Sequence, residues 1–311
     1  MSKILVTGGA GYLGSTLCQK LLDLNHEITV LDNFMFEQNS LAHLCHNPKL
    51  TIHAGDVRSK SLMQNLLRDK DIIIPLAALV GAPLCEKDPV GAKTTNHDAI
   101  IMMLNLLSKD QMVLMPTTNS AYGSGDEKNF CTEDSELKPI SLYAREKVEV
   151  EKALMEHTSA ISFRLATVFG MSPRMRIDLL VNDFTYRAVK DRFIVLFEGQ
   201  FKRNYIHVRD VSRAFIHGID NFKNMQGEIF NVGLSDANVS KAELCEKIKN
   251  HLPQFTYIEA PVGSDPDRRN YIVSNEKIEK AGFVTQHTLD YGIEELIKGY
   301  TGLKNSKYGN V

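Results

Sequence analysis

Three glycines, Gly8, Gly11 and Gly14, separate an apolar run at residues 3–7 from a helical pattern at residues 13–24. In this order of strand, turn and helix, the spacing GxxGxxG is a variant of the dinucleotide-binding fingerprint. Gly8 permits the tight turn, Gly11 lets the backbone approach a pyrophosphate, and Gly14 lets the helix pack closely on a sheet. An ordinary glycine-rich turn is the alternative. The flanking elements favour a nucleotide-binding α/β fold.

The rest of the first half alternates short β-branched runs with amphipathic stretches. We expect strands at residues 27–32, 50–54, 71–76, 112–116 and 160–164, and helices at 59–69, 98–107 and 141–157. Strands separated by helices imply right-handed βαβ units. The predicted fold class is therefore α/β, a Rossmann doubly wound parallel sheet.

After Gly170 this rhythm changes, which indicates a second, smaller α/β lobe. We expect a loop at 171–176, a helix at 179–190, loops through 254–270, helices at 276–281 and 289–300, and a frayed tail at 304–311. The Rossmann domain is expected at 1–170, with part of 203–235 returning to it. The second lobe is expected at 171–202 and 236–311.

Composition excludes several classes of protein. The 311 residues carry 36 Lys plus Arg against 38 Asp plus Glu, a net charge of −2, which argues against nucleic-acid binding. The longest apolar stretch, residues 72–84, is shorter than the roughly 20 residues of a membrane span. Five scattered cysteines without a CxxC pair predict free thiols, no metal site and a cytoplasmic location.

An acidic residue after the second predicted strand indicates which dinucleotide is bound. Asp32 lies 18 residues after Gly14, where a carboxylate accepts hydrogen bonds from the adenosine ribose and repels a 2′-phosphate. No Arg or Lys lies between Lys20 and Lys49 to bind such a phosphate, so NAD is favoured over NADP. A loop Asp that caps a helix is the alternative. The other residues expected to contact NAD in this half of the chain are Tyr12, Leu13, Asn33, Asp56, Val57, Leu76, Ala77 and Ala78.

Tyr143 and Lys147 are four residues apart on a predicted helix and therefore share a face. A tyrosine with its ordinary pKa near 10 is a poor base at neutral pH, and a neighbouring ammonium favours the phenolate. A surface Tyr–Lys pair is the alternative. Thr117 and Thr118 follow the fifth predicted strand, where a hydroxyl could share a substrate oxygen with Tyr143, and Thr117 is also expected to contact NAD.

Taken together, these motifs resemble the extended short-chain dehydrogenase/reductases, the NAD-dependent epimerase/dehydratase group that acts on nucleotide sugars. The resemblance rests on TGGAGYLG at 7–14, Asp32, LAA at 76–78, TTNSAYG at 117–123, YAREK at 143–147 and RNYIHVRDV at 203–211. It implies a Rossmann domain, a nucleotide-sugar lobe, tightly held NAD⁺, hydride transfer at sugar C4 and a homodimer that uses the helix at 141–157.

The resemblance also implies roles for single residues. Tyr143 takes the proton of the C4 hydroxyl, Lys147 binds the nicotinamide ribose, and Thr118 is the catalytic hydroxyl. Asn96 lies near the cofactor. Arg203, with Arg268 or Arg269, binds the substrate diphosphate. Further substrate contacts are expected from Val80, Gly81, Asn119, Arg174, Arg176 and Asn182.

The residues after Thr118 bear on the reaction. Dehydratases of the family carry Asp-Glu or Glu there, whereas this chain has Asn119 and Ser120, which disfavours dehydration. A Cys at 119, typical of the reductase/3,5-epimerases, is also lacking. Two reactions remain, 4-epimerisation and 4-dehydrogenation, and three segments (76–85, 118–123 and 172–188) resemble a GDP-heptose 4-dehydrogenase of polysaccharide biosynthesis, which favours a GDP-sugar. A non-catalytic NAD-binding regulator is the alternative class, but such proteins usually lack the Tyr or the Lys.

Overall fold

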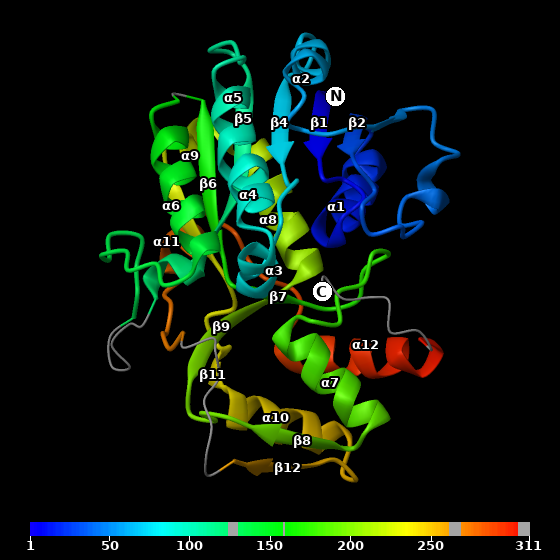
Figure 1. Ribbon diagram of the computed structural model, residues 1–311, viewed down its shortest axis with the longest axis vertical. Helices are drawn as coiled ribbons and strands as arrows, with labels where there is room; N and C mark the ends of the chain where they lie inside the picture. The colour runs from blue at the N-terminus through cyan, green and yellow to red at the C-terminus, as the bar shows by residue number, and fades with distance from the viewer. Residues whose placement is uncertain (124–129, 158, 261–268, 304–311) are drawn as a thin grey trace.

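The computed structural model describes residues 1–123, 130–157, 159–260 and 269–303. The tail expected at 304–311 and part of the loop expected at 254–270 lie outside these residues. Within them the chain forms a large parallel sheet flanked by helices and, below it in Figure 1, a smaller lobe of helices and short strands.

The large sheet has seven parallel strands in the order β10-β6-β5-β4-β1-β2-β3. Their bounds are β1 Lys3–Thr7, β2 Glu27–Asp32, β3 Leu50–Ala54, β4 Ile72–Pro75, β5 Met112–Thr118, β6 Ala160–Leu165 and β10 Ile229–Val232. The order reverses between β1 and β4, the switch point at which doubly wound folds bind nucleotides. The predicted fold class is confirmed.

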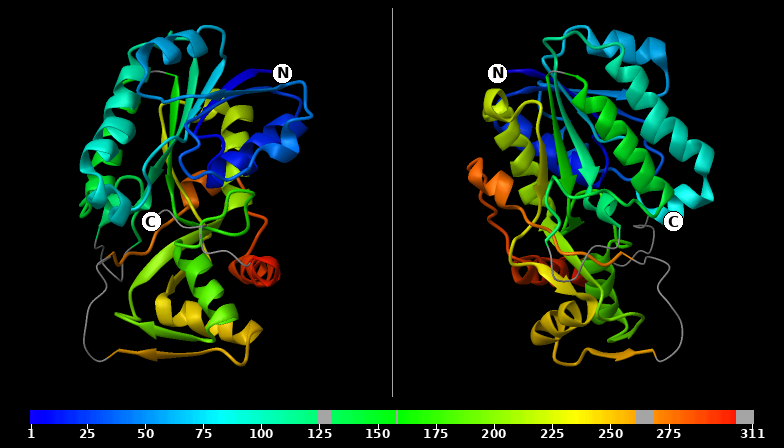
Figure 2. Two further views of the ribbon diagram at one scale, coloured as in Figure 1. Left: turned by 45° about the vertical axis from the view of Figure 1, so that its right-hand side comes forward. Right: turned by 90° about the vertical axis from the view of Figure 1, so that its left-hand side faces the viewer.

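Helices cover both faces of this sheet (Figure 2). Ile4 and Val6 of β1 pack toward α1 and α8, whereas Leu5 packs toward α2, α5 and α6, as expected for a strand buried on both faces. These helices are α1 Tyr12–Asp23, α8 Val208–Asp220, α2 Lys60–Leu67, α5 Ala99–Leu104 and α6 Leu142–Met155. The connecting helical segments are η1 Ala42–Leu44, α3 Ala82–Lys87, α4 Pro89–Ala92, η2 Lys93–Asp98, η3 Asn119–Tyr122, α9 Phe222–Met225 and α11 Glu276–Lys280.

The smaller lobe has its own core, in which Phe169, Tyr205, Phe255 and Tyr300 are buried. It contains two small sheets, β11-β9-β7 and β12-β8. Its elements are β7 Thr167–Phe169, β8 Phe193–Leu196, β9 Lys202–His207, β11 Asn238–Ser240, β12 Thr256–Glu259, α7 Leu180–Lys190, α10 Lys241–His251 and α12 Leu289–Gly302. β10 comes after β7, β8 and β9 in the chain and returns to the large sheet, where it pairs with β6.

Two predicted segments differ from the structure. The helix expected at 98–107 is shorter in the structure, α5 Ala99–Leu104, and follows η2, a π-helical turn whose buried Asn96 side chain binds the backbone of Leu79. The region expected to be loops at 254–270 contains β12, which pairs in parallel with β8. Prolines on both sides of β12 obscured a four-residue strand that depends on its partner.

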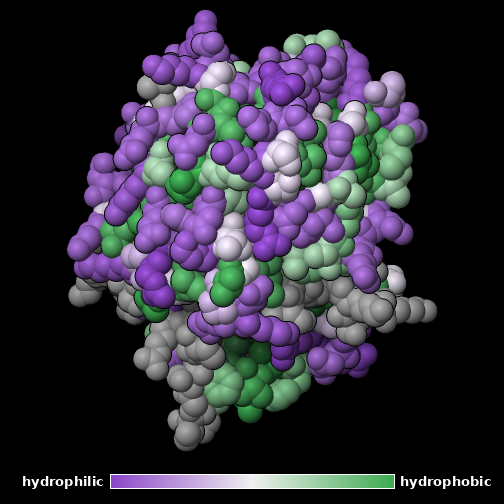
Figure 3. Space-filling model, turned by 45° about the horizontal axis from the view of Figure 1, so that its top comes forward, coloured by the Kyte–Doolittle hydropathy of each residue, from purple (hydrophilic) through white to green (hydrophobic). Residues whose placement is uncertain are grey.

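The face of the molecule shown in Figure 3 is largely hydrophilic, with apolar residues in scattered groups. Among the described residues, no helix combines the length and apolar character that crossing a membrane requires. All five cysteines are free thiols, as predicted, and only Cys45 is exposed.

Candidate active site

A cavity of about 470 Å³ lies between the carboxyl ends of the large sheet and the smaller lobe. On the sheet side, which we call the sheet wall, it is lined by the glycine loop, Asp32, Thr118, Tyr143 and Lys147. On the other side, the lobe wall, it is lined by Arg174, Arg176, Leu179 and Arg269. The cavity therefore lies where α/β proteins place ligands, and each wall is supplied by a different part of the chain.

The glycine loop is closely packed against the β4 end. Gly8 has φ +70°, and a Cβ there would lie 2.6 Å from the backbone nitrogen of Ala77. A side chain on Gly14 would collide with the carbonyl oxygen of Gly8. Helix α1 begins after Gly11 and has no side-chain cap, so its first N–H groups remain for an anion. The loop thus has the shape and the donors that a pyrophosphate requires.

Asp32 is held rigidly at the end of β2. Its carboxylate accepts hydrogen bonds from the backbone N–H groups of Ala10 (2.9 Å) and Phe34 (2.8 Å). Burial raises the pKa of Asp32 above its ordinary value, and these hydrogen bonds oppose the rise. The other predicted NAD contacts from the first four strands, Tyr12, Leu13, Asn33, Asp56, Val57, Leu76, Ala77 and Ala78, all line the cavity.

Tyr143 and Lys147 line the cavity together, and two arginines of the lobe wall also act on Tyr143. Burial raises the pKa of Tyr143 to about 12, and Arg176 and Arg269 oppose this rise. Burial lowers the pKa of Lys147 to about 8, and its ammonium donates to the carbonyl oxygen of Pro116 at 3.2 Å. The lobe wall therefore adds positive charge opposite Tyr143, and the effect of Lys147 on the acidity of Tyr143 stays a prediction.

Thr118 is part of a chain of hydroxyl groups. Its Oγ1 donates to Ser120 Oγ at 3.0 Å and accepts from the Ser120 N–H at 3.1 Å. Arg269 of the lobe wall also donates to Ser120 Oγ. The hydroxyl of Thr117, in contrast, donates to the buried carboxylate of Glu151 at 2.8 Å. Thr118 rather than Thr117 thus has its hydroxyl in contact with a second residue of the cavity.

Four predicted site residues do not line the cavity, and each is buried: Asn96, Asn119, Asn182 and Arg203. Asn96 holds the backbone of Leu79 through hydrogen bonds of 2.8 and 3.0 Å. Asn182 accepts from the Gly170 N–H and donates to the carbonyl of Arg176. The amide of Asn119 has no partner among the described residues. Asn96 and Asn182 are therefore placed to support the cavity from behind, whereas Val80 and Gly81 line it directly.

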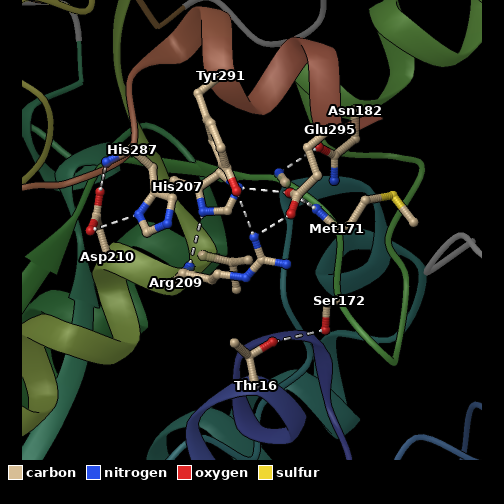
Figure 4. A network of polar contacts seen from close by, with 12 residues as sticks. Thr16, Met171, Ser172, Asn182, His207, Arg209, Asp210, His287, Tyr291 and Glu295 are labelled. Atoms are coloured by element: carbon tan, nitrogen blue, oxygen red, sulfur yellow. Dashed lines mark hydrogen bonds and ion pairs between the residues drawn. The ribbon is translucent and has the colours of Figure 1, made fainter. Parts of the chain in front are cut away.

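A polar network fixes the segment that carries Arg174 and Arg176 of the lobe wall (Figure 4). Glu295 of α12 accepts from the Met171 N–H at 2.9 Å and contacts His207 at 2.8 Å and Arg209. Although burial favours the neutral acid, His207 and the Met171 N–H keep the pKa of Glu295 below its ordinary value. Ser172 donates to the Tyr12 carbonyl at 2.6 Å, which joins this segment to the glycine loop.

The cavity residues that were not predicted from the sequence include Phe36, Gln38 and Leu179. Phe36 and Gln38 belong to the loop after β2, and Leu179 directly precedes α7. Nothing in their local pattern distinguishes them from ordinary loop and helix-terminal residues. Only the packing of the two lobes brings them together.

The strand order and the glycine loop define a Rossmann-fold dinucleotide-binding protein. The sequence model of the NAD dependent epimerase/dehydratase family matches residues 4–233, and the chain belongs to this family. NAD is therefore its cofactor, and the residues of the glycine loop and Asp32 fit that dinucleotide.

Relatives cover nearly the whole chain. It is 25% identical over 312 residues to the low-salt glycan biosynthesis protein Agl12 of Haloferax volcanii, covering 96% of this chain and 98% of that protein. It is 25% identical over 319 residues to a UDP-glucose 4-epimerase of Corynebacterium glutamicum, covering 92% of each. The fold matches UDP-glucuronic acid 4-epimerase from Bacillus cereus in complex with NAD, with a TM-score of 0.84, 21% identity and 99% coverage of both chains.

Proposed function

We propose that this protein oxidises C4 of a nucleotide-linked sugar with NAD⁺. The observation that carries the proposal is the common cavity of the glycine loop, Thr118 and Tyr143, with Arg176 and Arg269 facing them from the second lobe. A nucleotide sugar has a diphosphate that arginines bind and secondary hydroxyls that a phenolate can deprotonate.

In this proposal the phenolate of Tyr143 takes the proton of the C4 hydroxyl, while the Thr118 hydroxyl orients the same oxygen. The glycine loop, Asp32 and Lys147 would hold NAD⁺, which when bound accepts the hydride from C4. Arg269 and Arg176 would bind the diphosphate, and their charge makes Tyr143 more acidic. Arg203 and Asn182 do not reach the cavity and would act from behind it.

The fate of the hydride separates two candidate reactions. The epimerase relatives favour its return to the opposite face of the keto sugar, which is 4-epimerisation, and we place this reaction first. Release of the keto sugar, the GDP-heptose 4-dehydrogenase reaction that three segments of the sequence resemble, is the second candidate. Dehydration is disfavoured because Ser120, at the position of the dehydratase Glu, is no base and is hydrogen-bonded by Arg269.

The experiment is incubation of the purified protein with separate UDP- and GDP-sugars, followed by mass spectrometry and NMR of the sugar. An unchanged mass with inverted C4 supports epimerisation, and loss of two hydrogens supports dehydrogenation. Loss of water would contradict our interpretation of Asn119 and Ser120. The absence of any change at C4 across the panel would contradict the proposed function.

Four finer features belong to the same proposal. We propose a nucleotide-sugar lobe at 171–202 and 236–311 beside a Rossmann domain at 1–170, with β10 in the sheet of the latter. We also propose a GDP-sugar substrate, a cytoplasmic location and a homodimer through α6. The substrate panel tests the nucleotide, and sedimentation of wild-type protein tests the dimer.

A further inference from the structure

Arg174 is a buried cation that the proposed chemistry leaves unused. It lies in the segment before α7, lines the cavity and is only 2% exposed. Its guanidinium carbon lies 4.0 Å from the ring centroid of Phe36, which belongs to the loop after β2. The contact therefore bridges the two walls at the end of the cavity where Asp32 is located.

Both partners of this bridge are held in place. Ser172, two residues before Arg174, is bound to the Tyr12 carbonyl and to α1 through Ser15 and Thr16. On the other side, Ser40 donates to the carbonyl of Ala10 at 2.7 Å and fixes the Phe36 loop to the glycine loop. Arg174 and Phe36 are therefore held face to face across the nucleotide cavity by segments that are each tied to the glycine loop.

The electrostatics favour a contact with an aromatic ring over an exposed ion pair. Burial lowers the pKa of Arg174 to about 10, and the neighbouring Arg176 lowers it further, while Asp178 and Asp32 oppose the shift. A desolvated guanidinium gains more from the face of a ring than a hydrated one does. The contact with the Phe36 ring therefore stabilises the Arg174 guanidinium in the position that links the two walls.

A further observation favours a ligand site at this end of the cavity. Gln38, two residues after Phe36, also lines the cavity, and both polar atoms of its amide are buried without a partner in the described part of the chain. A buried amide of this kind needs a hydrogen-bonding partner to offset its desolvation, and a ligand in the cavity can supply one.

We propose that Arg174 and Phe36 form a clamp that retains NAD(H) by closing its adenosine half between the two lobes. Release of the dinucleotide then requires the Arg174–Phe36 contact to separate. The inference rests on NAD binding by the family and on the position of Asp32. It does not depend on the proposed reaction at the sugar.

The test measures how fast NADH leaves the protein. Protein loaded with NADH is mixed with excess NAD⁺, and the fluorescence of bound NADH is followed over time. In Arg174→Met and in Phe36→Leu we expect release to be roughly 10- to 30-fold faster, the scale of a desolvated cation–π contact. Arg187→Met, at an exposed arginine of α7 outside the cavity, is the matched control and should match wild type.

The double variant separates a clamp from two independent contacts. If the residues act as one bridge, Arg174→Met/Phe36→Leu releases NADH about as fast as either single variant. Effects that multiply, or unchanged release in both single variants, would overturn the proposal. So would a loss of NADP binding alone, since Arg174 would then be a 2′-phosphate ligand. Because the assay contains no sugar, an error in the proposed reaction leaves its outcome unaffected.

Discussion

The two walls of the cavity offer different chemical groups to a ligand. The sheet wall offers backbone N–H groups at the start of α1, a rigid carboxylate at Asp32 and the hydroxyls of Thr118 and Tyr143. The lobe wall offers three guanidinium groups, Arg174, Arg176 and Arg269. The sheet wall thus suits an uncharged ribose and a pyrophosphate at a helix terminus, whereas the lobe wall supplies charge. In the proposed mechanism catalysis needs both lobes, because cations on the lobe wall oppose the rise that burial causes in the pKa of the Tyr143 phenol on the sheet wall.

The largest expected effect lies on the sheet wall. Tyr143→Phe removes the general base and should lower kcat by roughly 10²- to 10⁴-fold, the usual contribution of acid–base catalysis. NAD should remain bound, which analysis of the nucleotide released on denaturation will check. Tyr257→Phe, whose hydroxyl contacts Glu246 away from the cavity, is the control. Unchanged turnover in Tyr143→Phe would show that the base is elsewhere.

The next prediction concerns the lobe wall. Arg269→Met should lower kcat/KM by roughly 10- to 100-fold, the scale of a charge-assisted hydrogen bond, with most of the loss in KM. Steady-state kinetics with the accepted nucleotide sugar will measure it. Arg68→Met, at an exposed arginine beyond α2, should behave as wild type. If KM were unaltered and only NADH release changed, Arg269 would belong to the cofactor rather than to the substrate.

The same contrast explains what the sequence could predict. The glycine loop, Asp32, β1, β2 and β3 are coded by short contiguous patterns, and the predicted strand bounds of 3–7, 27–32 and 50–54 agree with the structure. Tertiary packing, in contrast, decides which side chains reach the lobe wall. Arg203 and Asn182 have suitable chemistry yet are buried and do not line the cavity, whereas Phe36 and Gln38 line it from a loop without a motif.

The buried ammonium of Lys147 on the sheet wall should destabilise the folded protein. Burial lowers the pKa of Lys147 to about 8 in the folded protein. Between about pH 8 and the ordinary lysine pKa of the unfolded chain, the unfolded chain binds more protons than the folded protein does, so the free energy of unfolding rises with pH. Lys147→Met should therefore stabilise the protein at pH 7 by about 2 kcal/mol, after the lost hydrogen bond to Pro116 is subtracted. Urea unfolding at pH 7 and pH 10 will measure this gain, which should shrink at the higher pH. Lys152→Met on α6 provides the control, and a gain that does not vary with pH would contradict the assignment.

The smallest expected effect tests the coupling between the walls. Arg176 lowers the pKa of Tyr143, so Arg176→Met should raise it. Because the base acts when deprotonated, activity rises as the pH passes the pKa of Tyr143, and this rising limb should move upward by about one unit. The profile of kcat against pH at saturating sugar reports the shift separately from any loss of binding. In Arg187→Met the limb should stay in place. If the rising limb of the kcat profile were also unshifted in Arg176→Met, the lobe wall would bind the substrate without changing the pKa of Tyr143.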